Sequence, residues 1–193
     1  ELEFTAVWTV NEYTVTWKVE GEADKVETYD YSEAITKYEP TKTGYVFSGW
    51  DAEIPATMPA EDLVFNGSWN PATDTKYTVN IHTMNADGTY TTATEVLEGT
   101  TDAEVTAKYT VENGFEFNAE KSTESGVVAA DGSLVLDVYI DRKTITISFN
   151  TDGGTAVEAL SGLYGAATGT PAETTKTGYT FAGWNPSVPA TFP

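Results

Sequence analysis

The chain has 193 residues, 40% of them hydrophobic, and its 30 acidic and 10 basic residues give a formal net charge of −20. This charge repels phosphate backbones and anionic lipid headgroups, and no run approaches the roughly 18 apolar residues of a membrane span. Nucleic acid and direct membrane insertion are therefore excluded for this segment, and the absence of cysteine excludes a disulfide framework and thiolate chemistry.

Residues 1–8 have the pattern of a single strand. The large apolar positions of this segment are Leu2, Phe4 and Trp8. The same Leu-x-Phe-x-x-x-Trp spacing recurs in residues 63–69, where alternate side chains share one face of a strand. We expect residues 1–8 to be the closing strand of a preceding repeat, which would make the chain a segment cut from a longer protein.

Residues 13–69 are predicted to form one complete repeat. It opens with the alternating strand Tyr13–Trp17 and closes with the strand at 63–69. Between them, Ser32–Tyr38 begins with a serine and an acidic residue, which favours one or two helical turns.

Residues 77–143 are predicted to form a different, strand-rich unit. Two alternating runs flank Asn85-Ala86-Asp87-Gly88, a sequence typical of a hairpin turn. Thr101–Glu104 supplies capping and acidic residues before an apolar run to Tyr109, which predicts a short helix. The longest apolar stretch, 134–140, is expected to be the central strand.

Residues 144–193 repeat the first unit. The segment Thr41–Trp50 (TKTGYVFSGW) recurs 134 residues later as Thr175–Trp184 (TKTGYTFAGW), and Ile54–Pro59 recurs as Val188–Pro193. Such self-similarity is typical of repeat proteins. This copy is expected to lack a closing strand, because the chain ends at Pro193.

Hairpin, short helix and further strands in each unit predict an α+β fold of tandem small β-grasp (ubiquitin-like) domains with one short helix each. Short polar connections predict an elongated arrangement of semi-rigidly spaced units.

The two Gly-Tyr-x-Phe-x-Gly-Trp segments, with the turn at 149–155, resemble the Listeria–Bacteroides repeat, also called the internalin B-repeat. The resemblance covers residues 13–69 and 144–193 and the strand at 1–8, whereas residues 77–143 resemble a mucin-binding-protein-like β-grasp module. It implies a bacterial cell-surface protein that is exported and wall-anchored, in which repeats space or present an adhesive domain.

Most aromatic residues are predicted to be structural, since a repeat of some 60 residues without disulfides must place its largest side chains in its core. The residues assigned to cores or to packing between repeats are Trp17, Phe47, Trp50, Phe65, Trp69, Phe149, Phe181 and Trp184. Tyrosine also stacks on sugars and anchors interfaces, so Tyr29, Tyr31 and Tyr90 are candidates for an exposed binding surface.

Catalytic, metal and cofactor sites are not indicated. His82 is the only histidine, has no cysteine or second histidine as a partner, and is interpreted as an ordinary strand residue. The Asp-Gly pairs at 87, 131 and 152 lack the series of spaced acids of a calcium loop, so they are interpreted as turns.

The favoured function is therefore a non-catalytic stalk or spacer in a bacterial cell-surface adhesin. The alternative is a module that binds a host glycan or host protein through an exposed aromatic surface, and an enzyme ranks third. A further hypothesis is head-to-tail self-association, in which Leu2, Phe4 and Trp8 of one molecule complete the open sheet of another's third segment.

Overall fold

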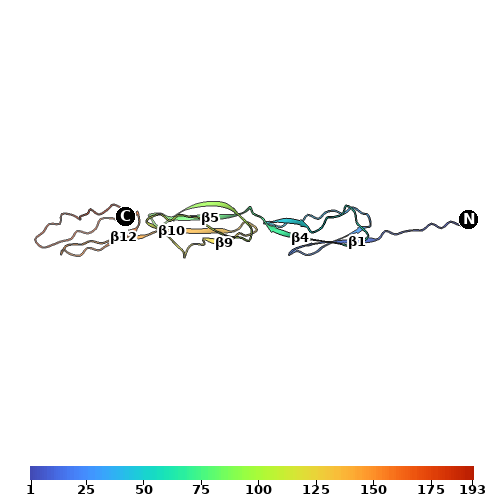
Figure 1. Ribbon diagram of the computed structural model, residues 1–193. Coiled ribbons are helices and arrows are strands. Elements are labelled where there is room, and N and C mark those ends of the chain that lie inside the picture. Colours follow the sequence, from blue (N-terminus) through green and yellow to red (C-terminus); the bar gives the residue numbers. More distant parts are fainter. The chain divides into compact units, whose positions relative to one another are not determined.

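The computed structural model describes residues 1–193, which form twelve strands and no helix (Figure 1). The chain divides into two units. The first contains residues 1–75 with 99–103 and 129–132, and the second contains residues 76–98, 104–128 and 133–193. The expected α+β fold with a helix in each repeat is wrong, because every regular element is a strand.

Both expected helices are replaced by turns and extended chain. In the first, Ser32 adopts φ +67°, outside the helical range, and Ile35 donates its backbone N–H to Ala56 O at 3.1 Å. In the second, Asp102 adopts φ +64°, and Glu104–Thr106 becomes strand β7, paired with β9 (Ser125–Val127). Long-range backbone pairing and β-branched side chains at both places outweigh the capping signals.

The first unit contains a four-stranded mixed sheet. Its strands are β1 (Glu12–Val19), β2 (Lys25–Asp30), β3 (Tyr45–Trp50) and β4 (Leu63–Pro71), in the order β2-β1-β4-β3. The pair β1 and β4 is parallel, and the two outer pairs are antiparallel. The expected closing strand therefore lies inside the sheet, between the first and third strands.

The core of this sheet follows the two-residue period of β1, whose Val15 and Trp17 are 0% and 1% exposed. Phe65 of β4 stacks on Trp17 with ring centroids 5.0 Å apart, and Trp50 of β3 lies 4.8 Å from Trp17. Met58 closes the same cluster from the loop before β4.

Two later segments complete the first unit. The Thr101 N–H donates to Ala72 O at 2.9 Å, and the buried hydroxyls of Thr75 and Thr101 lie 2.7 Å apart. Gly44 lies so close to Ala130 that a Cβ there would approach its carbonyl oxygen to 2.5 Å. The end of β4 is therefore fixed by hydrogen bonds and close packing.

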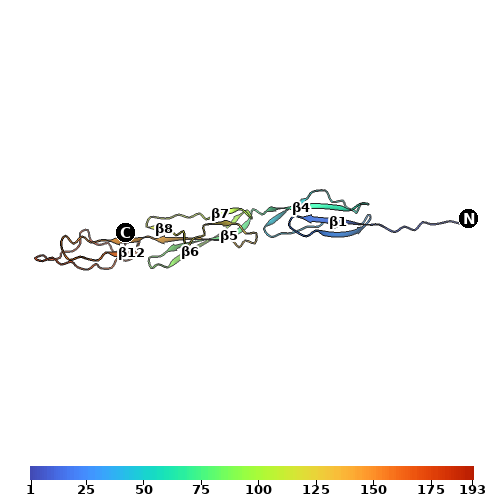
Figure 2. The same cartoon turned by 90° about the horizontal axis from the view of Figure 1, so that it is seen from below.

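The second unit contains another mixed four-stranded sheet, in the order β6-β5-β10-β8. Figure 2 labels three of its strands, β5, β6 and β8. These strands are β5 (Thr75–Met84), β6 (Tyr90–Gly99), β8 (Phe115–Phe117) and β10 (Val135–Arg142). The predicted hairpin and central strand are confirmed, because Asn85 donates its N–H to Thr89 O in the turn and β10 pairs with both β5 and β8.

The core of this sheet is built from alternate residues of β5 and β10. Val79, Leu136 and Val138 are 4%, 0% and 0% exposed, and Ala107 and Val128 join them from the segments around β7 and β9. The opposite side chains of β5 and β10 form the other face of the sheet, which is the face considered below.

The third repeat, at the end of the second unit, has only two paired strands, β11 (Thr144–Ile147) and β12 (Leu160–Leu163). Its C-terminal loop nevertheless matches the first repeat. Phe192 exchanges backbone hydrogen bonds with Gly165 and Ala166, as Met58 does with Ser32 and Glu33. The short connection to β10 is held by Arg142, which donates to Met84 O at 2.9 Å and Tyr164 O at 2.7 Å.

Candidate functional site

The outer face of the middle sheet carries a polar and aromatic cluster. Because β5 and β10 are parallel, His82 lies opposite Tyr139 and Asn80 lies opposite Asp137. The His82 and Tyr139 rings stack with centroids 4.2 Å apart. We call this group, with its neighbours Tyr90, Lys121 and Asp141, the outer-face cluster.

Hydrogen bonds hold the histidine half of the cluster in place. His82 Nε2 lies 3.0 Å from Asp137 Oδ1, and His82 Nδ1 lies 2.7 Å from Thr92 Oγ1. Asn80 donates to Asp137 at 2.9 Å. These bonds from His82 and Asn80 hold the pKa of the Asp137 carboxyl below its ordinary value, so this acid is an anion at neutral pH.

The tyrosine half of the cluster combines an aromatic ring with charge. The Tyr90 hydroxyl donates to Asp141, whose other oxygen accepts a 2.6 Å bond from Asn118. Lys121 lies 4.9 Å above the Tyr90 ring and donates to the Tyr90 oxygen at 2.7 Å. Partial burial and the bond to Asp141 raise the pKa of Tyr90, while the bond to Tyr90 raises that of Lys121, so both stay protonated.

This cluster offers rings of partly exposed aromatic side chains beside fixed carboxylate, amide and ammonium groups. That combination suits a hydroxyl-rich or peptide ligand, because rings stack on apolar faces and the polar groups orient the ligand. No group of three or more histidine or acidic side chains in the chain is arranged so that it could hold a metal ion. Nor does the chain form a helix that could cross a membrane.

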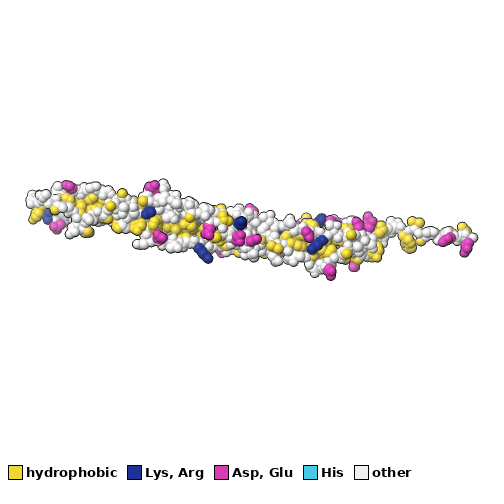
Figure 3. All heavy atoms as spheres, turned by 90° about the horizontal axis from the view of Figure 1, so that it is seen from above, with side chains coloured by type: hydrophobic (Ala, Val, Ile, Leu, Met, Phe, Trp, Pro, Cys, Tyr) yellow, Lys and Arg dark blue, Asp and Glu magenta, His cyan; other side chains and the backbone are white.

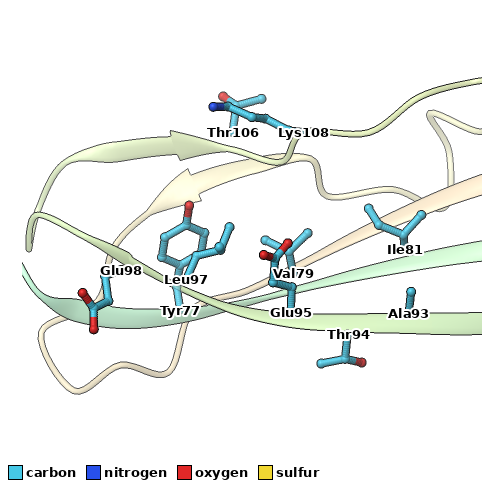
Figure 4. A pocket seen from close by; sticks show the side chains of 10 residues that line it. All are labelled: Tyr77, Val79, Ile81, Ala93, Thr94, Glu95, Leu97, Glu98, Thr106 and Lys108. Atoms are coloured by element: carbon cyan, nitrogen blue, oxygen red, sulfur yellow. The ribbon is translucent and has the colours of Figure 1, made fainter.

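A groove of about 440 Å³ lies on the core side of the same sheet, between β6 and the chain after β7 (Figure 4). Tyr77 and Leu97 point into it toward Thr106 and Lys108, whereas Thr94 points away. The floor is apolar, and Glu95, Glu98 and Lys108 line its edges. We call it the β6–β7 groove; it could admit an apolar side chain but brings no reactive groups together.

The three tyrosines proposed for binding lie in different environments. Tyr31 is 53% exposed, and Tyr90 is part of the outer-face cluster. Tyr29, by contrast, is only 9% exposed and belongs to the first core, because alternation along β2 turns it toward Trp17. Its expected exposure is wrong, and its hydroxyl donates to the partly buried Glu27 carboxylate on the same strand.

The aromatic residues assigned to cores lie in two related clusters. Trp17 and Phe65 are fully buried, while Phe47, Trp50 and Trp69 are half-buried and make edge contacts with one another. In the third repeat, Phe149, Phe181 and Trp184 are also half-buried and form a similar chain of ring contacts. The segments 41–50 and 175–184 thus place the same ring types side by side.

The segment at 1–8 makes no strand pairing. Leu2, Phe4 and Trp8 are 88%, 90% and 88% exposed, so these three large apolar side chains contact solvent.

The sequence did not single out the outer-face cluster. Its residues on β5 and those on β10 are more than 50 residues apart, and the parallel pairing of these two strands brings them together. The available signal was the alternation of polar residues at 80, 82, 137, 139 and 141 within apolar strands.

Two mixed sheets and a recurring aromatic motif define a protein of tandem β-rich repeats. The chain belongs to the Listeria–Bacteroides repeat domain family, whose model matches residues 13–90 and 146–188. The family expected from the two Gly-Tyr-x-Phe-x-Gly-Trp segments is confirmed.

Two relatives come from Evansella cellulosilytica. One, named as a membrane protein, is 27% identical over 192 residues, which cover 93% of this chain and 28% of the relative. The other, named as a Gly-rich membrane protein, is 24% identical over 199 residues, covering 93% of this chain and 22% of the relative. The chain therefore spans about a quarter of the length of these curated relatives.

Two solved structures are also similar. Streptococcal High Identity Repeats in Tandem (SHIRT) domains 3–4 from a cell surface protein are 15% identical, with a TM-score of 0.24, over 68% of this chain and 98% of that one. A type 2 repeat of the mucus binding protein MUB from Lactobacillus reuteri is 14% identical, with a TM-score of 0.17, over 68% and 99%. Both TM-scores are too low to inform the fold or the function of this chain.

Proposed function

We propose that this chain is a non-catalytic spacer in a bacterial cell-surface adhesin, and that its repeats hold other parts of the protein at a fixed separation. The proposed repeats are 13–69, 77–143 and 144–193, with residues 1–8 as the closing strand of a preceding repeat. Two findings support this proposal: the chain belongs to a repeat family, and it is similar to longer proteins that are named as membrane proteins.

The observation that carries the proposal is the way the chain passes from one repeat to the next. Short polar connections are expected at 70–76 and 141–143. The second is almost entirely strand, since β10 runs to Arg142 and β11 begins at Thr144, whereas residues 72–74 lie between β4 and β5. A connection made of paired strand has little freedom to bend, because its backbone hydrogen bonds would have to break.

Side chains hold the chain beside both connections. Within the first unit, the Tyr45 hydroxyl donates to Asp102, and the threonine pair Thr75 and Thr101 is buried. Within the second unit, at 141–143, the Arg142 guanidinium lies 4.8 Å from the Phe115 ring while it donates to two carbonyls. Residues of a solvated, flexible linker would not form these hydrogen bonds and ring contacts.

An extracellular position on the cell surface, with a wall anchor elsewhere in the protein, is part of the same proposal. The acidic surface fits it. Figure 3 shows acidic side chains spread over the visible face without one dominant patch, which favours solubility over a cationic ligand site.

Small-angle X-ray scattering tests the spacer function. A compact globule of this length would have a radius of gyration of about 16 Å. The proposal predicts a value well above this that does not change with ionic strength. A value near that of the globule would contradict it.

The second candidate function is binding of a host glycan or host protein, and the outer-face cluster favours it. A glycan array with the whole chain tests this candidate directly. Selective binding that is lost in Tyr139→Ala and in Tyr90→Ala, but kept in Tyr31→Ala on the other unit, would make the chain a binding module. If the unmodified chain shows no selective binding, the spacer function is the only one of the two that is supported.

A further inference from the structure

Strand β6 is an open edge of the middle sheet. It pairs with β5 on one side, and no backbone hydrogen bond joins residues 91–98 to any other segment. Residues 91–96 are all exposed. The chain continues for many residues before β5 and after β6, so this open edge belongs to the middle repeat itself.

The register of β6 on β5 shows which backbone groups are free. Asn85 donates its N–H to Thr89 O, and the Thr94 hydroxyl donates to Asn80 across the two strands. Hydrogen-bonded and non-hydrogen-bonded positions alternate along an antiparallel pair, so the N–H and C=O groups of Thr94 and Val96 point away from β5. Groups of this kind are what an added peptide strand bonds to at an exposed sheet edge.

The β6–β7 groove lies on the core side of this edge. Ala93, Glu95 and Leu97 share the core side of β6 because side chains alternate along a strand, and Lys108 stands across the groove from them (Figure 4). Ala93 is the smallest of the three, which leaves room beside Ile81. A strand added to β6 would therefore place alternate side chains in the groove.

The charged side chains along the groove have no ionic partner. None of Glu95, Glu98 and Lys108 forms an ion pair in the chain. Glu95 is the notable one, because it shares the groove with the buried side chains of Tyr77 and Val79. A charge that faces inward on an edge strand opposes pairing with an apolar strand, and like charges directly opposite one another destabilise a strand pair.

These charges indicate the kind of strand that the edge accepts. Two copies that paired antiparallel through this part of β6 would bring Glu95 and Glu98 of both copies together, and each copy has a formal net charge of −20. A second copy is therefore a poor occupant. A strand with a basic residue opposite Glu95 would instead be stabilised, since opposite charges across a strand pair attract.

We propose that the β6 edge and the β6–β7 groove bind an extended, basic peptide segment of another protein, as a strand paired with β6. Apolar side chains of the peptide enter the groove beside Ala93 and Leu97, and the lysine or arginine between them lies opposite Glu95. The site shares no side chain with the outer-face cluster, so this interaction is separate from both proposed functions.

An NMR titration of the whole chain with a synthetic peptide tests the proposal. The probe is Thr-Val-Thr-Lys-Thr-Val-Thr with blocked ends, which has valines two residues to either side of a single charge. It should shift the amide resonances of residues 92–98 in a saturable manner and slow hydrogen exchange at Thr94 and Val96. The matched peptide with glutamate in place of lysine should not bind.

Two substitutions separate the contribution of charge from that of backbone pairing. Glu95→Gln should weaken binding of the lysine peptide by about threefold to fivefold, the effect of one exposed ion pair, and Glu95→Lys should reverse the preference so that the glutamate peptide binds better. Glu116→Gln makes the same charge change on β8, the other edge of the sheet, and should leave binding unchanged.

Val96→Pro removes an outward N–H group and should abolish binding, because proline is tolerated on an edge strand where its nitrogen faces solvent. Unchanged exchange at the Leu136 amide would show that the sheet is still folded.

Four outcomes would overturn the proposal: no binding of the lysine peptide at millimolar concentration, equal binding of the two peptides, a preference that Glu95→Lys does not reverse, or binding that survives Val96→Pro. Association of the chain with itself that is lost in Val96→Pro would also overturn it, by assigning the edge to a second copy. The spacer function does not depend on any of these results.

Discussion

The indole Nε1 of Trp17 donates a hydrogen bond of 2.7 Å to the carboxylate of Glu27. This bond joins the largest buried side chain of the first core to an acid on the neighbouring strand. Burial acts to raise the pKa of Glu27, but bonds from Lys25, Trp17 and Tyr29 together hold it below its ordinary value of 4.5.

The stability of the first unit should therefore depend on the charge of Glu27. A carboxyl with a depressed folded pKa contributes stability above its unfolded pKa and loses it as pH falls through the folded pKa. Glu27→Gln should be less stable than the unmodified chain at pH 7, and the difference should shrink below about pH 4.5. Thermal unfolding across this range measures it, with Glu22→Gln, on the exposed turn, as the control for net charge.

Burial of Phe65 against Trp17 predicts a large cost of truncation. Phe65→Ala should lower the free energy of unfolding of the first unit by roughly 3–5 kcal/mol. Val64→Ala, at an outward-facing position that is 53% exposed, should change it by no more than about 0.5 kcal/mol. Chemical denaturation followed by tryptophan fluorescence measures both. Equal effects would show that Phe65 is not a core residue.

The repeated glycines provide a matched pair of substitutions. Gly44 and Gly178 occupy the same motif position with φ of +75° and +83°, so alanine at either should cost about 1–2 kcal/mol from backbone strain. Only at Gly44 would the new Cβ also meet Ala130. Gly44→Ala should thus accelerate hydrogen exchange at the Ala72 amide, which donates to Gly44 O, while Gly178→Ala leaves it unchanged.

The buried hydroxyl pair of Thr75 and Thr101 should behave as a unit. Thr101→Val leaves the other hydroxyl without a partner at a buried site, at a cost of about 1–3 kcal/mol. Thr75→Val with Thr101→Val should cost less than the sum of the single changes, because no orphaned group remains. A double-mutant cycle by thermal unfolding tests this, and strict additivity would show that the hydroxyls are not coupled.

Much of the sheet structure could be predicted from the sequence. The β5–β6 hairpin follows from two alternating runs around Asn85–Gly88, and the similarity of 41–50 to 175–184 gave both the repeat and its family. These features depend on local periodicity and on self-similarity, which are visible in a single chain.

The absence of the two expected helices and the presence of the outer-face cluster could not be predicted, for one physical reason. The segment after Ser32 is extended because it bonds to residues 56–58, and His82 lies beside Asp137 because β5 and β10 are parallel. Each depends on a partner far away in the sequence, and such pairing overrides local propensity. Tyr29 was misplaced because the face that β2 turns inward is set by its pairing with β1.

The central claim, that the chain holds its repeats at a fixed separation, is tested most directly by a distance between spin labels in the first and third repeats. Because the chain has no cysteine, Val64→Cys and Ser161→Cys, both exposed strand positions, give two unique labelling sites. A single narrow distance distribution that broadens in Arg142→Ala is predicted. A broad distribution in the otherwise unmodified chain would contradict the spacer function.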